Sequence, residues 1–439
     1  MLFRSMLALA LVASMACSSD NVGNQRTTLG QTVGVNTHYG SYGPVNHEAL
    51  AQLANAGVSF VRNDLTWDSV EKEAGVYDFV GSGYDELVDR CESLGLRILF
   101  ILDYGNSLYG DPDSVVSEEA RAAFAAFAGA AAERYGRRGH GWEIWNEPNL
   151  GAFTPELYAE LVRATVPALR SADPNAEVAV GALVFGTLSE ITEGLGMGLS
   201  GSRFLEELAA TGVLSLANEV TIHLHRSAPP EDAAGDIANA RDILKQAGYA
   251  LPVSSGEFGY STYDPGAPPT GINYLQAVTP DRQASYVARM LLFNYSQDVH
   301  RSVVFKDVDA QDPEPGNLEH NFGLMADDAT AKPSYTALST LTELLGDAGP
   351  PETIPLGAGE HALRFVRPDG AQVTALWAEQ SATWLLRAQG SGHARVLARN
   401  GDDQTPAGLS NSAQVTLEPD DGPIYLVGDV TVESIGGSF

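Results

Sequence analysis

A short apolar run that ends on polar side chains is found in Gly141-Trp-Glu-Ile-Trp-Asn-Glu-Pro-Asn149. Its first part, Gly141–Asn146, has the length and composition of a buried strand. Asn146 and Glu147 then stand at the carboxyl end of that strand, and Pro148 forces the chain out of it because proline cannot continue a sheet. A buried strand that ends on a carboxylic acid is typical of parallel-sheet enzymes, whose reacting groups lie at such ends.

The same alternation of a short apolar run and an amphipathic run extends on both sides of this stretch, from Val33 to Leu345. The other predicted strands are Thr32–Asn36, Val58–Asn63, Arg97–Asp103, Glu177–Ala182, Glu219–His223, Pro252–Glu257 and Ser302–Asp307. The predicted helices are His47–Ala56, Tyr84–Leu94, Glu118–Tyr135, Pro155–Ser171, Ser202–Ala210, Asp232–Ala247, Asp281–Tyr295 and Lys332–Leu345. This pattern predicts an α/β fold, the (β/α)8 or TIM barrel. An open doubly wound sheet is disfavoured because no glycine-rich phosphate loop follows the first strand.

The residue pattern of the chain changes at a linker, Gly346–Pro351. Beyond it, short segments of alternating polarity lack any helical signal, which predicts a small C-terminal β-sandwich domain. We therefore expect a barrel over residues 30–347 and a β-sandwich accessory domain over residues 352–439.

The amino-terminal segment has the features of an export signal. Residues 1–16 combine one arginine, an apolar run and small residues, which is the shape of a signal peptide. Cys17 follows Ser14-Met-Ala16 as in a bacterial lipobox, so we expect lipidation of Cys17 and membrane anchoring through it, although ordinary signal cleavage and secretion also fit. Residues 17–29 then form a polar tether of a surface, periplasmic or secreted protein.

Composition excludes several classes of protein. The formal net charge of −30 disfavours binding to nucleic acid or to an anionic membrane surface. Only Cys17 and Cys91 are present, so neither a disulfide framework nor a cysteine metal site is expected. No cofactor is expected either.

Two glutamates at strand ends can divide one reaction between them. Glu147 follows the fourth predicted strand, and Glu257 ends the seventh, in Ser254-Ser-Gly-Glu-Phe-Gly259. One acid can protonate a leaving oxygen while the other, ionised, attacks an anomeric carbon. Asn146 can hold a sugar 2-hydroxyl beside them.

These motifs resemble clan A of the glycoside hydrolases. Trp145-Asn-Glu-Pro-Asn149 and Gly256-Glu-Phe-Gly259 resemble its acid/base and nucleophile segments, which assigns Glu147 as acid/base and Glu257 as nucleophile. Val61-Arg-Asn-Asp-Leu-Thr-Trp67 and Thr221-Ile-His223 resemble segments of family 39, whose arginine supports the nucleophile and whose histidine enters the site. The resemblance implies a retaining glycosidase that cleaves O-glycosidic bonds of a poly- or oligosaccharide by double displacement.

The sequence departs from this family at the centre of the site. His225 stands where the clan commonly has a tyrosine, and the eighth strand carries Phe305 where a tryptophan is common. The opening segment Val35-Asn-Thr-His-Tyr-Gly40, which includes His38, is more similar to the bacterial exopolysaccharide endoglycosidases than to the β-xylosidases. Predicted substrate-binding residues are Asn146, Arg62, His223, His225, His38 and Phe305.

Two alternatives remain at this stage. A barrel with both glutamates could bind carbohydrate without cleaving it. His223-Leu-His225 could also be a metal-binding pair of an amidohydrolase, but that class needs further histidines and a bridging acid that the chain does not offer, so no metal is expected.

Overall fold

Parallel strands close into a barrel in the computed structural model, which describes residues 27–40, 42–112, 114–151, 153–263, 276–311, 317–389 and 394–435. Their order around the barrel is β1-β10-β9-β8-β7-β6-β5-β2. The bounds are β1 Val33–Thr37, β2 Phe60–Thr66, β5 Arg97–Asp103, β6 Gly141–Ile144, β7 Val178–Val184, β8 Glu219–His223, β9 Val253–Phe258 and β10 Ser302–Val304. The predicted (β/α)8 fold is confirmed.

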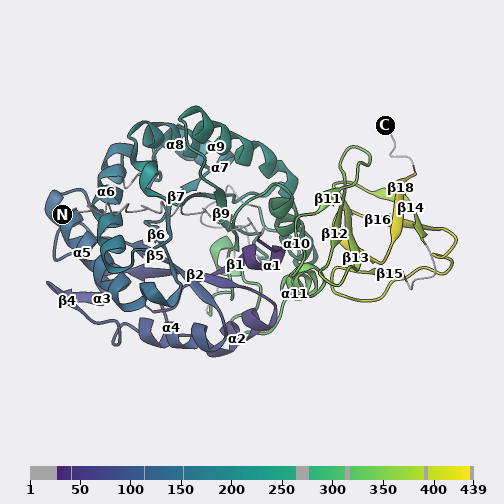
Figure 1. The fold of residues 1–439 in the computed structure, drawn as a ribbon, viewed down its shortest axis with the longest axis horizontal. Helices are drawn as coiled ribbons and strands as arrows, with labels where there is room; N and C mark the ends of the chain where they lie inside the picture. The colour runs from purple at the N-terminus through teal and green to yellow at the C-terminus, as the bar shows by residue number, and fades with distance from the viewer. Residues whose placement is uncertain are drawn as a thin grey trace, which may run out of the picture.

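Helices surround the barrel and cover its outer face (Figure 1). They are α2 His47–Asn55, α4 Tyr84–Ser93, α5 Glu118–Tyr135, α6 Pro155–Ala172, α8 Gly201–Ala210, α9 Ala234–Gln246, α10 Pro280–Ser296 and α11 Pro333–Leu345. Side chains of Ser117, Thr154 and Thr279 cap α5, α6 and α10 by accepting a hydrogen bond from a first-turn backbone N–H. These caps fix where the long helices begin.

Several short elements were not predicted. They are α1 Leu29–Thr32, α3 Trp67–Val70, the hairpin β3 Glu71–Glu73 with β4 Val76–Tyr77, α7 Thr187–Gly194 and four 3-10 helices, which include η3 Pro230–Ala233. Helix α7 buries only Ser189 and Thr192, so it has no apolar stripe that the sequence could reveal.

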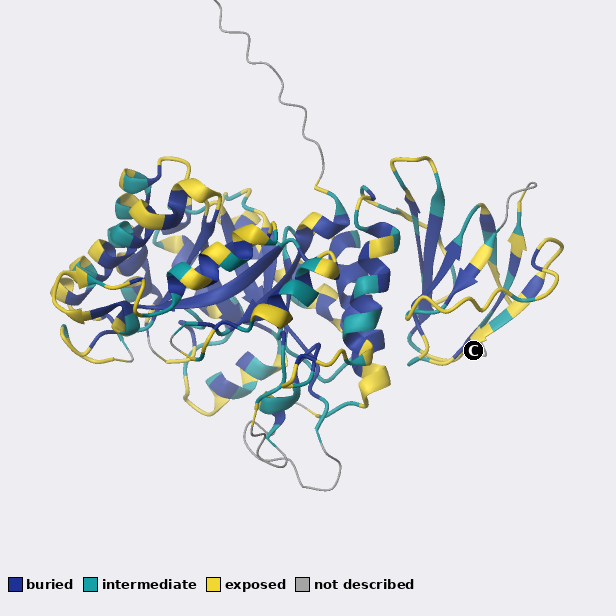
Figure 2. Ribbon diagram, turned by 90° about the horizontal axis from the view of Figure 1, so that it is seen from below, coloured by how far each residue is buried: buried dark blue, intermediate teal, exposed yellow. Residues whose placement is uncertain are grey.

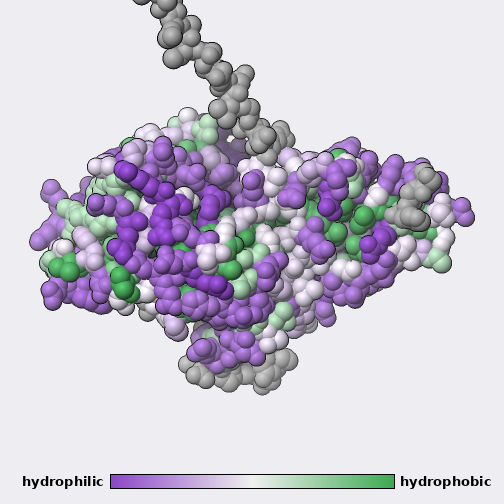
Figure 3. Space-filling view, turned by 60° about the horizontal axis from the view of Figure 1, so that its bottom comes forward, coloured by the Kyte–Doolittle hydropathy of each residue, from purple (hydrophilic) through white to green (hydrophobic). Residues whose placement is uncertain are grey.

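Burial places the main core inside and around the barrel. Every residue of β1 and β2 is buried, and helix α10 is buried along most of its length, whereas other outer helices also carry exposed residues (Figure 2). Cys91 is buried on α4. The face seen in Figure 3 is mainly hydrophilic, with hydrophobic residues in small groups between the hydrophilic ones.

The C-terminal part is an antiparallel β-sandwich, as predicted. One sheet has the order β11-β12-β13-β17-β15 and the other the order β16-β14-β18. The strands are β11 Glu352–Thr353, β12 Glu360–Val366, β13 Gln372–Ala378, β14 Ala382–Ala388, β15 Arg395–Leu397, β16 Ala413–Leu417, β17 Ile424–Val427 and β18 Val430–Ser434. Leu376, Trp384, Leu386 and Leu426 belong to the buried cluster between the sheets.

The sandwich lies against α10 and α11, on one side of the barrel (Figure 1). Glu231 of η3 is buried there and pairs with Arg289 of α10 at 2.5 Å. Trp377 of β13 donates its indole N–H to the same carboxylate at 2.7 Å. The interface therefore links the sandwich to the segment that follows β8.

The predicted signal peptide and Cys17 lie outside the described residues, as does most of the predicted tether. Among the residues that the structure describes, no helix is long and apolar enough to span a bilayer.

Candidate active site

The chain turns sharply after β6 and so presents Glu147 at the barrel mouth. Trp145 and Glu147 have φ angles of 66° and 48°, in the left-handed region that few side-chain-bearing residues adopt. Backbone hydrogen bonds from Trp145 to Leu102 and from Glu147 to Ala182 hold this conformation. Such conformations cluster at functional sites because the surrounding structure must stabilise them. Trp145 itself is buried.

Glu257 lies at the end of β9 and is almost fully buried. Its neighbouring glycines make room for protein atoms. A Cβ atom on Gly256 would lie 3.2 Å from the imidazole of His223, and one on Gly259 would lie 2.2 Å from the carbonyl oxygen of Phe305. The glycines thus let β9 pack closely against β8 and β10.

Arg62 of β2 connects the residues of the site. Its guanidinium donates to Glu257 Oε1 at 2.6 Å and to Asn146 Oδ1 at 2.9 Å. The Nε atom donates to Glu143 Oε2 at 2.6 Å, and Glu143 also accepts from the hydroxyl of Thr221. Since Arg62 and Glu143 are fully buried, each needs the other as a counter-charge. Glu143 therefore has a structural role as the buried counter-charge of Arg62.

His223 joins the two candidate catalytic acids. Its Nε2 atom lies 3.4 Å from the guanidinium of Arg62, which can only donate, so Nε2 accepts and Nδ1 carries the proton. Nδ1 then donates to Glu147 Oε1 at 2.8 Å, and it lies 3.7 Å from Glu257 Oε2. The sum of these two distances is the upper limit on the gap between the two oxygens. That limit admits the ~5–5.5 Å gap of retaining glycosidases.

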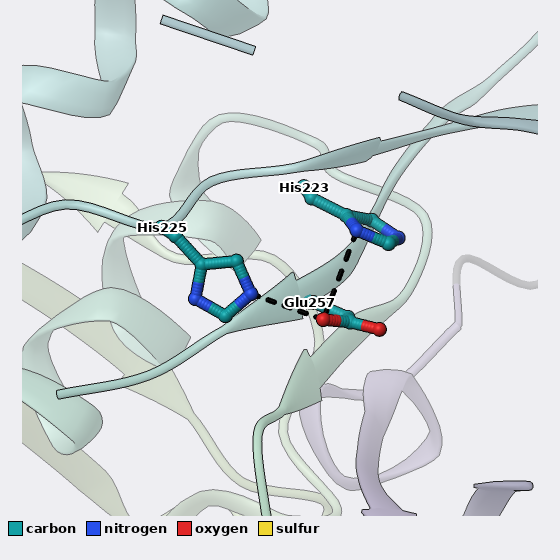
Figure 4. Close-up of side chains that lie close together, drawn as sticks. All are labelled: His223, His225 and Glu257. Carbon is teal, nitrogen blue, oxygen red and sulfur yellow. Dashed lines mark hydrogen bonds and ion pairs between the residues drawn. The ribbon is translucent and has the colours of Figure 1, made fainter. Parts of the chain in front are cut away.

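His225 reaches Glu257 from the segment after β8. His223 and His225 both point toward the Glu257 carboxylate (Figure 4). His225 Nε2 lies 3.0 Å from Glu257 Oε2, in the role that the clan commonly gives to a tyrosine. Burial alone would raise the pKa of Glu257, but the nearby His223, Arg62 and His225 hold it well below its usual range. Glu257 is therefore ionised at neutral pH, as a nucleophile must be.

His38 and Phe305 lie at the mouth of the barrel as predicted. Phe305 packs edge-on against His38 and against His225, with ring centroids 5.7 Å and 5.5 Å apart. His38 Nδ1 lies 2.7 Å from Asp64. Burial lowers the pKa of His38, but the hydrogen bond and charge of Asp64 outweigh it, so the pKa is raised.

The structure adds three residues that sequence analysis did not place in the site. Asp64 holds His38, Tyr104 hydrogen-bonds Asn146, and Asp103 of β5 lies buried beside Asp64. Burial, and then the charge of Asp64, raise the pKa of Asp103 well above its usual range. Asp103 ends β5, Tyr104 follows it, and Asp64 lies near the carboxyl end of β2, which was the available signal, but strand position does not show which side chains meet.

Donor atoms of His223, His225 and Glu257 lie within 4.8 Å of one another, a spacing that could suit a metal ion. The fit is poor, because Arg62 already supplies a positive charge 2.6 Å from Glu257 and occupies the second nitrogen of His223. A dication there would meet electrostatic repulsion from the buried guanidinium.

Comparisons with known proteins agree with the fold and the motifs. The model of the family Cellulase (glycosyl hydrolase family 5) matches residues 21–197, which is less than half of the chain. No curated protein was found to match.

Solved structures of glycoside hydrolases align with nearly the whole chain. A family 39 glycoside hydrolase from Bacteroides cellulosilyticus WH2 aligns at 22% identity over 92% of this chain and 81% of that chain, with a TM-score of 0.74. A family 39 β-xylosidase from Caulobacter crescentus aligns at 17% identity over 90% and 95%, with a TM-score of 0.60. The catalytic domain of a family 30 xylanase C from Talaromyces cellulolyticus aligns at 14% identity over 92% and 97%, with a TM-score of 0.60.

The chain therefore has the barrel-and-sandwich fold of clan A glycoside hydrolases. The resemblance to family 39 that the sequence motifs predicted is confirmed at the level of fold.

Proposed function

We propose that this protein is a retaining glycosidase that cleaves O-glycosidic bonds of a poly- or oligosaccharide. The observation that carries the proposal is the contact of one imidazole, His223, with both Glu147 and Glu257 at the barrel mouth. The fold of glycoside hydrolases and the lowered pKa of Glu257 support it.

In the first step, the ionised Glu257 attacks the anomeric carbon, and the bond from that carbon to the leaving oxygen breaks. Glu147 gives its proton to the leaving oxygen. His223 donates to Glu147 Oε1, which leaves the other carboxyl oxygen of Glu147 to carry the proton toward the substrate. Arg62 keeps Glu257 ionised and oriented until it attacks.

In the second step, Glu147 accepts a proton from water, whose oxygen attacks the anomeric carbon and displaces Glu257. Glu257 carries no negative charge while it is esterified, so it does not repel the carboxylate of Glu147 in this step. Two inversions then return the original configuration. Asn146, which Arg62 holds, lies where it can bind the sugar 2-hydroxyl in both transition states.

The experiment is a pair of substitutions. Glu257→Ala should abolish hydrolysis, because no covalent intermediate can form. Glu147→Ala should lose most activity on natural glycosides and less on aryl glycosides with good leaving groups. Added azide should then restore turnover and yield a glycosyl azide of retained configuration. A fully active Glu257→Ala enzyme would contradict the assignment, and so would identical losses on both substrate types in Glu147→Ala.

We also propose that the protein is exported and anchored through a lipid on Cys17, on the basis of the signal and lipobox pattern. Several acyl chains, at about 0.8 kcal/mol for each buried CH₂, would hold it firmly on a membrane. Cys17→Ser should move the protein from the membrane to the soluble fraction without changing its activity. A native protein that is free in the medium, with an unmodified terminus at or beyond residue 17, would refute the anchor.

A further inference from the structure

A hollow of about 360 Å³ opens beside the catalytic pair. One wall is formed by the start of α7, including Leu188 and Glu190, and the other by residues that follow β8. His225, which bonds the candidate nucleophile, lies in its lining. The hollow therefore adjoins the residue that bonds the candidate nucleophile, and its volume falls in the range of small-ligand sites.

His225, which lines this hollow, has one polar ring atom without a partner within the described residues. Its side chain is only 10% exposed, and its Nε2 donates to the ionised Glu257. Nδ1, on the other side of the ring, is buried and has no hydrogen-bond partner among the described residues. A buried polar atom without a partner is costly, so a ligand group that donates to Nδ1 would gain from binding here.

The charges of the lining indicate which ligand fits. Arg226 is the lining's one permanent cation, and it is already engaged by Asp236 at 2.7 Å and by the Leu224 carbonyl. Asp232 and Glu190 also line the hollow, and neither forms an ion pair within the part of the chain that the structure describes. The lining is thus rich in acceptors and net negative, so it favours hydroxyl or amino donors and repels carboxylate or sulfate groups.

The position of the hollow indicates which part of the substrate enters it. Glu147 follows β6, whose neighbour in the barrel is β7, and the loop after β7 forms one wall. The leaving oxygen must contact Glu147 to receive its proton, so the leaving group extends toward this wall.

We propose that this hollow is a leaving-group subsite for a sugar unit that bears hydroxyl or amino donors and no acidic group. The inference rests on the proposed glycosidase function and narrows its substrate to chains with a neutral or amino sugar on the leaving side. Such a subsite would exclude a uronate or a sulfated sugar at that position.

A binding experiment on the whole chain tests the ligand class. The imidazole ¹⁵N resonances would be followed by NMR while D-glucose, D-glucosamine or D-glucuronate is added, with His225 assigned from His225→Gln. We expect glucose and glucosamine to shift His225 Nδ1, and glucuronate to bind at least tenfold more weakly. In the double variant Glu190→Lys, Asp232→Lys that preference should reverse, whereas Asp242→Lys, an exposed acid on α9 away from the hollow, should keep it. Equal binding of the three sugars, or no shift of Nδ1, would overturn the proposal.

Kinetic measurements test whether the hollow binds the leaving group. Leu188→Trp fills the hollow. The kcat/KM for an oligosaccharide should then fall at least tenfold relative to the kcat/KM for an aryl glycoside with the same glycone. An unchanged ratio would overturn the leaving-group assignment. Neither measurement depends on azide rescue of Glu147→Ala, so a failure of the proposed function would be seen separately.

Discussion

At the scale of single residues, the guanidinium of Arg62 pairs with two acids, Glu143 and Glu257, that have different roles. It neutralises the buried Glu143, which the sequence places within a strand, and it keeps Glu257 ionised at the strand end. Strand position and the resemblance to family 39 together predicted that Arg62, His223 and both candidate catalytic glutamates belong to the site. The hydrogen bonds among them depend on side-chain rotamers, so the partnership of His38 with Asp64 could not be predicted.

The pH profile tests the contact of His225 with Glu257. Glu257 must be ionised to attack, and its pKa lies well below the usual range partly because His225 donates to it. His225→Phe removes that donor, so the pKa of Glu257 should rise and the acidic limb of the kcat/KM profile should move to higher pH by about one unit. The depressed pKa also stabilises the native state above the unfolded-state pKa, a contribution that is lost as pH falls through the native value.

A matched variant separates this electrostatic effect from packing. His225→Gln retains an N–H donor of similar reach, so its acidic limb should stay near that of the wild-type enzyme. If His225→Phe leaves the limb unmoved, or if both variants shift it equally, the donor role of His225 is wrong.

At the scale of elements, the sequence located the barrel strands well and their ends less well. The bounds predicted for β5 and β8 agree with the structure, whereas β6 and β10 end before Asn146 and Asp307. The reason at β6 is the left-handed conformation of Trp145, which breaks the strand and aims the following residues at the cavity. Local apolar patterns do not encode that turn.

Gly256 offers a test of how tightly β8 and β9 must pack. In Gly256→Ala the new methyl group would approach the His223 ring at 3.2 Å, so His223 must shift by a few tenths of an ångström. Because His223 positions both acids, we expect kcat to fall about tenfold with little change in thermal stability.

The control is Gly235→Ala on α9, where no atom lies within 4 Å of the added Cβ. This change should leave kcat unaltered and stabilise the helix by about 0.5–1 kcal/mol. A Gly256→Ala enzyme with unaltered kcat would show that His223 need not be held this closely.

At the scale of the whole molecule, the sandwich is joined to the barrel beside the site. Arg289 of α10 and Trp377 of the sandwich both donate hydrogen bonds to the carboxylate of Glu231. Glu231 lies on η3, which follows the segment that contains His225 and Arg226. The loss of helical patterns after the linker Gly346–Pro351 predicted a separate β-sandwich. It could not predict this contact, because the three residues are far apart in the chain.

The buried ion pair should dominate the stability of that interface. Arg289→Met leaves Glu231 buried without its cation, which should lower the free energy of unfolding by about 3–5 kcal/mol in urea denaturation. Arg282→Met breaks the more exposed pair of Arg282 with Asp420 in the same interface and should cost about 1 kcal/mol or less. Equal losses in the two variants would mean that burial of Glu231 does not set the stability of the contact.

The stereochemistry of the product tests the double displacement most directly. The contacts of His223 with Glu147 and Glu257 admit the ~5–5.5 Å gap between carboxyl groups at which a retaining glycosidase leaves no room for a water molecule between the sugar and its nucleophile. Proton NMR of the product formed first, recorded before mutarotation, should therefore show the same anomeric configuration as the substrate. An initial product of the opposite configuration would contradict the mechanism, even if both glutamates proved essential.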